Sequence, residues 1–94
     1  ARSWAARDSA AATRLAAART AVGEIADRHG VPVENLLAPE TLRRVTWTPP
    51  EPLTTDAVAA ALRSHGARDW QVRLTAEAVA RAFEADAQAG EQLR

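Results

Sequence analysis

The chain has 94 residues, enough for one small domain with a single modest core. Hydrophobic residues make up 47% of it, alanine is abundant, and β-branched and aromatic residues are scarce, so the composition predicts a helical protein with almost no sheet. The formal net charge is zero, which argues against a dedicated, strongly charged nucleic-acid binder, and the absence of cysteine excludes a disulfide scaffold and thiolate metal sites.

The first predicted element is a long amphipathic helix over residues 9–29. Leu15, Val22 and Ile25, together with Ala11 and Ala18, recur at spacings of three and four, so they share one face of this helix. Gly30 supplies the left-handed residue that commonly follows a helix end. We therefore expect this helix to contribute one continuous apolar stripe to the core.

The start of this helix sets the expected domain boundary. The side chain of Asp8 or Ser9 can accept hydrogen bonds from the free N–H groups of its first turn. Residues 1–8 show no clear amphipathic period, and we interpret them as a lead-in from a preceding domain. The folded domain is then expected to cover residues 9–89, and residues 90–94 are expected to fray.

The next segment, VPVENLLAPETLRRVTW, predicts two short helices. Asn35, Leu36 and Leu37 can form a single turn, and Pro39 pre-sets the backbone at the first position of the second helix. That helix must end by Thr48, because the residue before a proline is pushed out of the helical region and a stiff TPPEP loop follows. The residues expected to point inward are Leu37, Leu42 and Val45.

A further helix is predicted between the proline-rich loop and the second HG pair. Thr54 or Thr55, with Asp56, provides its start, and Gly66 ends it. Helical spacing connects Val58, Ala61, Leu62 and His65.

The last helix is predicted from Arg68 onward. Trp70 and Leu74 lie off its apolar stripe, so we expect a break or kink near Thr75, which can cap the following turn. The stripe itself consists of Val72, Ala76, Val79 and Phe83.

Nothing in the sequence assembles a catalytic site. His29 and His65 each stand in the last turn of a predicted helix, where a cation is favoured, so both are interpreted as helix caps. No serine lies in a nucleophile turn and no glycine-rich phosphate loop is present, which argues against covalent catalysis and nucleotide hydrolysis. We expect no catalytic residue, metal or cofactor site in this chain.

The remaining candidates for a functional role are the arginines. All twelve of the Lys and Arg residues are arginine, and none is lysine. Their guanidinium groups can grip phosphates bidentately. Alternatively, their stems cover apolar surface while their heads pair with the twelve acidic residues, as Glu77 can pair with Arg73 or Arg81 on the last helix. Arginines also border the apolar face of the first helix at positions 14, 19 and 28.

The tryptophans raise a similar choice between binding and packing. Trp47 and Trp70 could stack on bases, but each stands beside other apolar residues, so we interpret both as inward-pointing core residues. Trp4 is less constrained and could dock onto a neighbouring domain.

Two stretches carry a resemblance to a known family. RLAAARTAVGEIADRHGVPVENLLAPETLRRVTWTPP resembles the helical accessory domains called HRDC, which RecQ-type helicases and ribonuclease D share. LRSHGARDWQVRLTAEAVARAF is similar to the C-terminal HRDC-like domain of bacterial ribonuclease D. Together they span about residues 10–85.

The resemblance implies an all-α fold, an orthogonal bundle of about five helices with SAM-like architecture. It also implies a neighbouring catalytic domain that removes nucleotides from RNA 3′ ends with two divalent metal ions. No acidic metal-binding set of that kind is identifiable here, so we expect the catalytic domain to lie elsewhere in the parent chain.

Our leading hypothesis is an accessory domain that positions substrate for a ribonuclease D-like 3′–5′ exoribonuclease. RNA, bound weakly and as single-stranded 3′ ends, is the expected partner together with the catalytic domain. The expected nucleic-acid-binding residues are Arg43, Arg44, Arg68 and Arg73.

Two alternatives stay open. The chain could be a protein-interaction or intramolecular docking module, or the HRDC domain of a RecQ-type helicase that binds single-stranded DNA. No run of about 18 apolar residues and no signal peptide is present, so we expect no membrane partner, a cytoplasmic location and a monomeric isolated domain.

Overall fold

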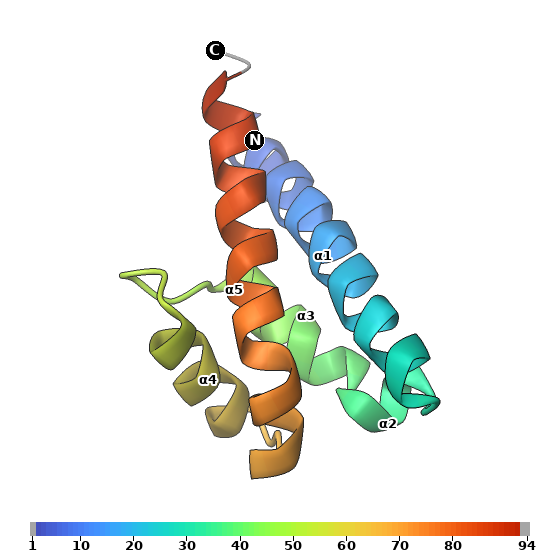
Figure 1. Ribbon diagram of the computed structural model, residues 1–94. Helices are drawn as coiled ribbons and strands as arrows, with labels where there is room; N and C mark the ends of the chain where they lie inside the picture. Colours follow the sequence, from blue (N-terminus) through green and yellow to red (C-terminus); the bar gives the residue numbers. More distant parts are fainter. Residues whose placement is uncertain (1, 93–94) are drawn as a thin grey trace.

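Two long helices and three short ones form the fold in the computed structural model (Figure 1). The structure describes the backbone of residues 2–92 and the side chains of residues 9–89. No strand occurs in residues 2–92, so the predicted all-α bundle of five helices is confirmed. The helices are α1 (Arg2–His29), α2 (Val33–Leu36), α3 (Pro39–Trp47), α4 (Thr55–Ser64) and α5 (Asp69–Gln92).

Helices α1 and α5 form the frame of the bundle. They lie side by side and run in opposite directions, so the start of α1 is near the end of α5 (Figure 1). Helices α2 and α3 pack against α1, and α4 packs against α5 and α3. The three short helices therefore cover one half of the long pair.

The predicted start of the first helix is wrong. Helix α1 begins at Arg2 and passes through Asp8 and Ser9. The carbonyl of Ser9 accepts a hydrogen bond from the side-chain hydroxyl of Thr13, four residues later, at 3.0 Å. Residues 2–8 contain no glycine or proline and are rich in alanine, so helix propensity continues the helix without an amphipathic period. The docking role expected for Trp4 lies outside the residues with described side chains.

Both HG pairs end their helices as predicted, and by the same hydrogen-bond pattern. Gly30 has φ +63°, its N–H donates to Asp27 O, and the Val31 N–H donates to Ala26 O at 3.1 Å. Gly66 has φ +100°, and the N–H groups after His65 repeat this pattern. This is the Schellman motif, in which a glycine at positive φ allows two free carbonyls to be satisfied.

The short helices follow the sequence prediction except at Trp47 and in α2. Helix α2 covers Val33–Leu36, so the single turn starts earlier than expected and Leu37, predicted to be part of it, is extended. Pro39 is the first residue of α3, and Thr48 ends it. Trp47, expected in the core, is 46% exposed, while Thr46 beside it is fully buried and its carbonyl accepts from Arg14 Nη1 at 2.7 Å. Adjacent residues of a helix point about 100° apart, so burying Thr46 turns Trp47 toward solvent.

Helix α4 begins as expected. The side chain of Thr54 accepts a hydrogen bond from the Ala57 N–H at 3.1 Å, which caps the first turn.

Helix α5 runs without the predicted break. The Thr75 hydroxyl is fully buried and donates to the carbonyl of Gln71 at 2.7 Å, four residues earlier, so it does not cap a new helix. Trp70 and Leu74, whose positions suggested the kink, stay 42% and 37% exposed. The helix needs no bend because these two side chains do not enter the core.

The backbone of α5 is helical to Gln92, and residues 93–94 of the expected frayed tail lie outside the described part.

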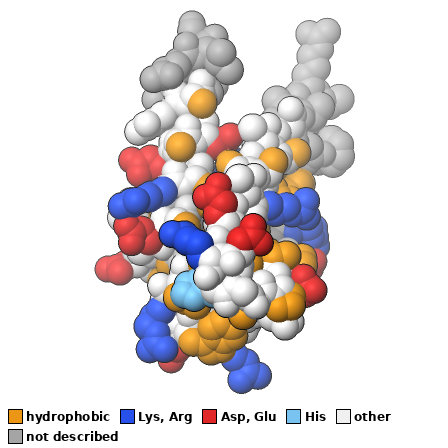
Figure 2. Space-filling view, turned by 45° about the vertical axis from the view of Figure 1, so that its right-hand side comes forward, with side chains coloured by type: hydrophobic (Ala, Val, Ile, Leu, Met, Phe, Trp, Pro, Cys, Tyr) orange, Lys and Arg blue, Asp and Glu red, His pale blue; other side chains and the backbone are white. Residues whose placement is uncertain are grey.

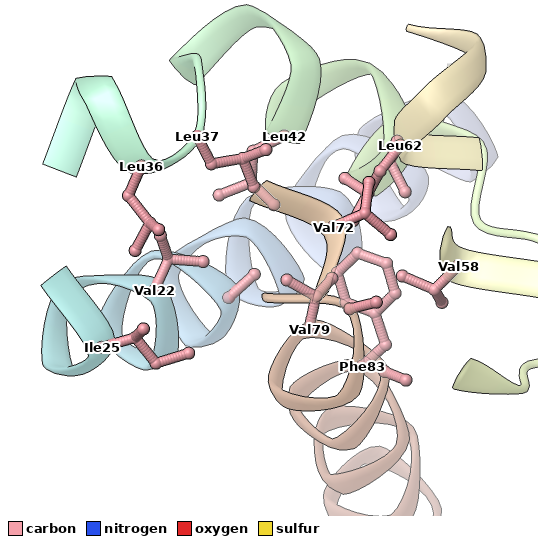
Figure 3. Packing of buried hydrophobic residues seen from close by; sticks show 14 of the residues in the cluster. Val22, Ile25, Leu36, Leu37, Leu42, Val58, Leu62, Val72, Val79 and Phe83 are labelled. Carbon is pink, nitrogen blue, oxygen red and sulfur yellow. The ribbon is translucent and has the colours of Figure 1, made fainter. Parts of the chain in front are cut away.

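The core lies where α5 meets α1 and the short helices (Figure 3). Phe83 of α5 lies beside Val58, and Val72 lies beside Leu62; Val58 and Leu62 come from α4. The core also includes the three residues of segment 31–47 that were predicted to point inward, namely Leu37, Leu42 and Val45. Burial of these apolar side chains contributes about 1.5–3 kcal/mol for each large residue and holds the helices in place.

None of the helices in residues 2–92 is both long enough and apolar enough to span a membrane.

Candidate nucleic-acid interface

The α3 arginine pair, Arg43 and Arg44, is engaged by one acidic side chain. Arg43 Nη2 lies 2.6 Å from Glu40 Oε1, and Arg44 Nε lies 2.9 Å from the same oxygen. These contacts follow from helical spacing, since residues three and four apart lie on the same side of a helix. All three side chains are exposed, so a phosphate can reach the arginines but must compete with the Glu40 carboxylate.

The titration of this group reflects the same geometry. Hydrogen bonds from Arg43 and then Arg44 lower the pKa of Glu40 to about 2, and the hydrogen bond with Glu40 raises the pKa of Arg43. Glu40 is therefore a carboxylate at neutral pH and cancels half of the pair's charge.

Arg68 stands at the turn between α4 and α5. Its backbone N–H donates to Gln71 Oε1 at 2.7 Å, and Gln71 Nε2 donates to Asn35 O at 3.1 Å. Gln71 thereby caps α5 and ties its start to α2. The exposed Arg68 side chain is presented from a backbone that is fixed on both sides.

Arg73 lies in an open groove between α1 and α5, with a volume of about 830 Å³. Arg28 and His29 line the groove from the end of α1. Arg81 also lines the groove, about two helical turns after Arg73 on α5. Its Nη2 lies 2.6 Å from Glu77 Oε1. This pair realises one of the two ion pairs predicted for Glu77. We call this surface, defined by Arg28, His29, Arg73, Glu77 and Arg81, the basic groove.

The four predicted arginines do not form one site. Arg73 alone among them lines the basic groove, while Arg43 and Arg44 project from α3 and Arg68 from the turn before α5. Figure 2 shows basic and acidic side chains interspersed over one face of the molecule, without a single large basic patch. The sequence places Arg28 at the edge of an apolar face but gives no sign that it lines the same groove as Arg73.

A second groove runs along the other side of α1, against α2 and α3, with a volume of about 440 Å³. Its charged lining consists of Arg19, Asp27 and Glu34, so it is slightly acidic. The apolar lining is Val22, Ala26, Val31, Pro32, Val33, Leu37, Pro39 and Leu42. We call this surface the apolar groove.

The histidines do not cap helices through their side chains. No hydrogen bond from either imidazole occurs within residues 9–89. His65 contributes its backbone instead, since its carbonyl accepts from Thr41 Oγ1 at 2.9 Å and joins α3 to the end of α4. His29 is exposed at the end of α1, in the basic groove.

Metal-dependent chemistry finds no support in these residues. No three His, Asp or Glu side chains converge in the part of the chain that the structure describes.

Comparison with known proteins gives two matches. The family model described as "3′ to 5′ exonuclease C-terminal domain" matches residues 1–83. A crystal structure of a protein from Bifidobacterium adolescentis matches 88% of this chain with 44% sequence identity and a TM-score of 0.74. The chain spans 20% of that protein's chain. No curated protein matches this sequence.

Proposed function

The chain belongs to the 3′ to 5′ exonuclease C-terminal domain family, and from this membership we propose that it is the accessory domain of a ribonuclease D-like 3′–5′ exoribonuclease. In this role it holds RNA for a catalytic domain and contributes no catalytic residue of its own. The family match over residues 1–83 carries the proposal. The parent enzyme is proposed to act in the cytoplasm, with its two divalent metal ions held by the catalytic domain.

The proposed contribution is binding and positioning. Guanidinium groups bind phosphate oxygens through two parallel hydrogen bonds, and such contacts hold a strand without reading its sequence. A weak contact of this kind is useful when it is tethered to a catalytic domain, because the tether raises the effective concentration of the RNA end near the active site. A formally neutral domain suits this task, since weak binding also permits release of the shortened strand.

The proposed RNA contacts are the exposed arginines Arg43, Arg44, Arg68 and Arg73. They differ in how readily they can accept a phosphate. Arg43 and Arg44 must exchange the Glu40 carboxylate for it, whereas neither Arg68 nor Arg73 forms a salt bridge within residues 9–89. Of these two, Arg73 alone lines a groove, so it is expected to contribute most among the four.

A titration of a short labelled single-stranded RNA with the 94-residue chain tests the proposal. We expect saturable binding at low salt. The logarithm of the affinity should fall linearly as the logarithm of the salt concentration rises, because bound arginines release counterions from RNA. A DNA strand of the same length shows whether the helicase-type alternative fits better. No RNA binding at low salt would contradict the proposed RNA contact.

A second candidate function is docking to another protein surface, most simply the catalytic domain of the same parent chain. It is favoured by large apolar side chains left in solvent, namely Trp47, Trp70 and Val33. Trp is enriched at protein interfaces, where it anchors the contact. Saturable binding to the separate catalytic domain, without an RNA signal, would favour this function over the first.

A further inference from the structure

The charge of the protein is unevenly distributed between its two grooves. The chain as a whole is formally neutral. The basic groove, however, contains three arginines and one glutamate, which give it a formal charge of +2 with His29 neutral. The apolar groove, with one arginine, one aspartate and one glutamate, has a formal charge of −1. An anion approaching the domain is therefore attracted toward one side of α1.

We propose that the basic groove between α1 and α5 binds the backbone of single-stranded RNA, with Arg28 and Arg73 as its phosphate-binding residues. This inference rests on the proposed function and assigns its main RNA contact to a surface that includes only one of the four predicted arginines. The α3 pair then contributes only weakly, because the Glu40 carboxylate already engages both of its guanidinium groups.

The absence of partners for Arg28 and Arg73 supports this assignment. Within residues 9–89, neither guanidinium forms a salt bridge, although Glu24 stands four residues before Arg28 and Glu77 four residues after Arg73. Glu77 pairs with Arg81 instead. Two arginines without a carboxylate partner therefore line one groove, and a bound phosphate would neutralise their charge.

Helix-end electrostatics explain only part of the cluster. Arg28 and His29 stand in the last turn of α1, where positive charge interacts favourably with the helix dipole. Arg73 lies in the second turn of α5, near the end of a helix that carries partial positive charge. Its presence there gains nothing from the dipole, so stability alone does not account for the position of Arg73.

The shape of the groove suits a flexible strand. Arg73 and Arg81 are separated by about 12 Å along α5, from the rise of 1.5 Å per residue, so cations stand at both ends of the groove. Between the helices, the small side chains of Ala21, Ala78 and Ala82 keep the surface low. Leu74, 37% exposed beside Arg73, offers an apolar contact for a ribose or base.

The test compares two double variants that remove the same charge. The groove variant, Arg28→Gln with Arg73→Gln, removes the two proposed phosphate-binding residues from the basic groove. The α3 variant, Arg43→Gln with Arg44→Gln, removes the α3 pair. Binding of a fluorescein-labelled oligouridylate to the 94-residue chain is measured by anisotropy over a range of salt concentrations. Circular dichroism melting verifies that each variant is folded; all four positions are exposed, and glutamine is a good helix former.

The groove variant is expected to bind about tenfold more weakly at low salt. The slope of log affinity against log salt concentration should become shallower by about 1.4, since each of the two lost phosphate contacts to a single strand contributes about 0.7. The α3 variant is expected to lose less than about threefold, the effect of net charge alone. A variant with Arg28→Lys and Arg73→Lys keeps the charge, so it should retain the salt slope while losing part of the affinity.

Different failures overturn different claims. If the unmodified chain does not bind RNA at low salt, the RNA-binding part of the proposed function fails, and the groove assignment fails with it. If the unmodified chain binds but both double variants lose affinity equally, or the α3 variant loses more, the groove assignment alone is wrong. Binding of a glutamate-rich peptide in preference to RNA would likewise overturn it in favour of an acidic protein partner.

Discussion

The two grooves beside α1 are built in different ways. The apolar groove is lined by Val22, Leu37 and Leu42, which are also core residues, so its surface cannot change without loss of stability. The basic groove is lined mostly by exposed side chains, among them Arg28, Arg73 and Leu74. Residues that do not hold the fold together are free to serve binding. Binding residues are therefore expected on the α1–α5 side of the molecule, and residues that determine stability on the α2–α3 side.

The largest expected effect is on stability, from the apolar groove. Leu42→Ala should lower the free energy of unfolding by about 2–5 kcal/mol, because it removes buried methyl groups and leaves a cavity. Leu74→Ala, the matched truncation in the basic groove, should change it by less than about 1 kcal/mol. Urea unfolding followed by circular dichroism measures both. Equal losses would remove the distinction between the two grooves.

The next effect concerns the turn that separates the grooves. Gly30 follows His29 of the basic groove and precedes Val31 of the apolar groove, and its φ of +63° is costly for any residue with a Cβ atom. Gly30→Ala should destabilise the protein by about 1–2 kcal/mol. There is open space around the added Cβ, so the loss would arise from the backbone and not from a clash. Thermal unfolding of Gly23→Ala, a position inside α1, provides the control and should show no loss.

A smaller effect is expected on RNA affinity. Glu77→Gln removes the acidic group of the basic groove and releases Arg81, so RNA should bind about two- to fivefold more tightly, the range of an exposed ion pair. Glu34→Gln makes the same change in the apolar groove and should leave affinity nearly unaltered. Anisotropy titrations of both variants at low salt measure the difference. An equal gain from Glu34→Gln would mean that overall charge, not the groove, attracts the strand.

The smallest effect is expected at Glu40, which lines neither groove. Hydrogen bonds from Arg43 and then Arg44 lower its pKa in the folded protein to about 2, below its ordinary value of 4.5. A lowered carboxyl pKa stabilises the folded state above the unfolded pKa, and this contribution disappears as the pH falls from about 4.5 toward 2. Melting temperatures of the unmodified chain and Glu40→Gln should therefore differ slightly at pH 6 and converge near pH 2. A constant difference across this range would show that the ion pair does not stabilise the fold.

Local sequence signals predicted most helix ends correctly. Gly30 and Gly66 occupy positive φ, Pro39 begins a helix, and Thr54 caps one, all as expected. Each of these depends on backbone chemistry within a few residues, which the sequence contains in full. The predicted start at Asp8 or Ser9 was wrong because a capping side chain does not interrupt an alanine-rich helix.

Predictions that required knowledge of the neighbours were less successful. Trp47 and Trp70 were expected inside because they are large and apolar, but the buried positions beside them are taken by Thr46 and Val72. The expected kink at Thr75 had the same origin, since it assumed that every large apolar side chain of α5 must be buried. Which side of a helix faces the core depends on where the other helices lie.

By itself, the sequence determined that this protein is helical, where its helices end and which residues form the main apolar stripes, because these properties follow from helical period and local backbone preferences. The tertiary structure alone decided which arginines come together. Arg28 and Arg73 lie far apart in the sequence, and they line one groove because α1 and α5 pack side by side in opposite directions. Arg43 and Arg44, adjacent in the sequence, instead share a glutamate of their own helix. The charge that a ligand meets is set by packing between helices, which no local pattern encodes.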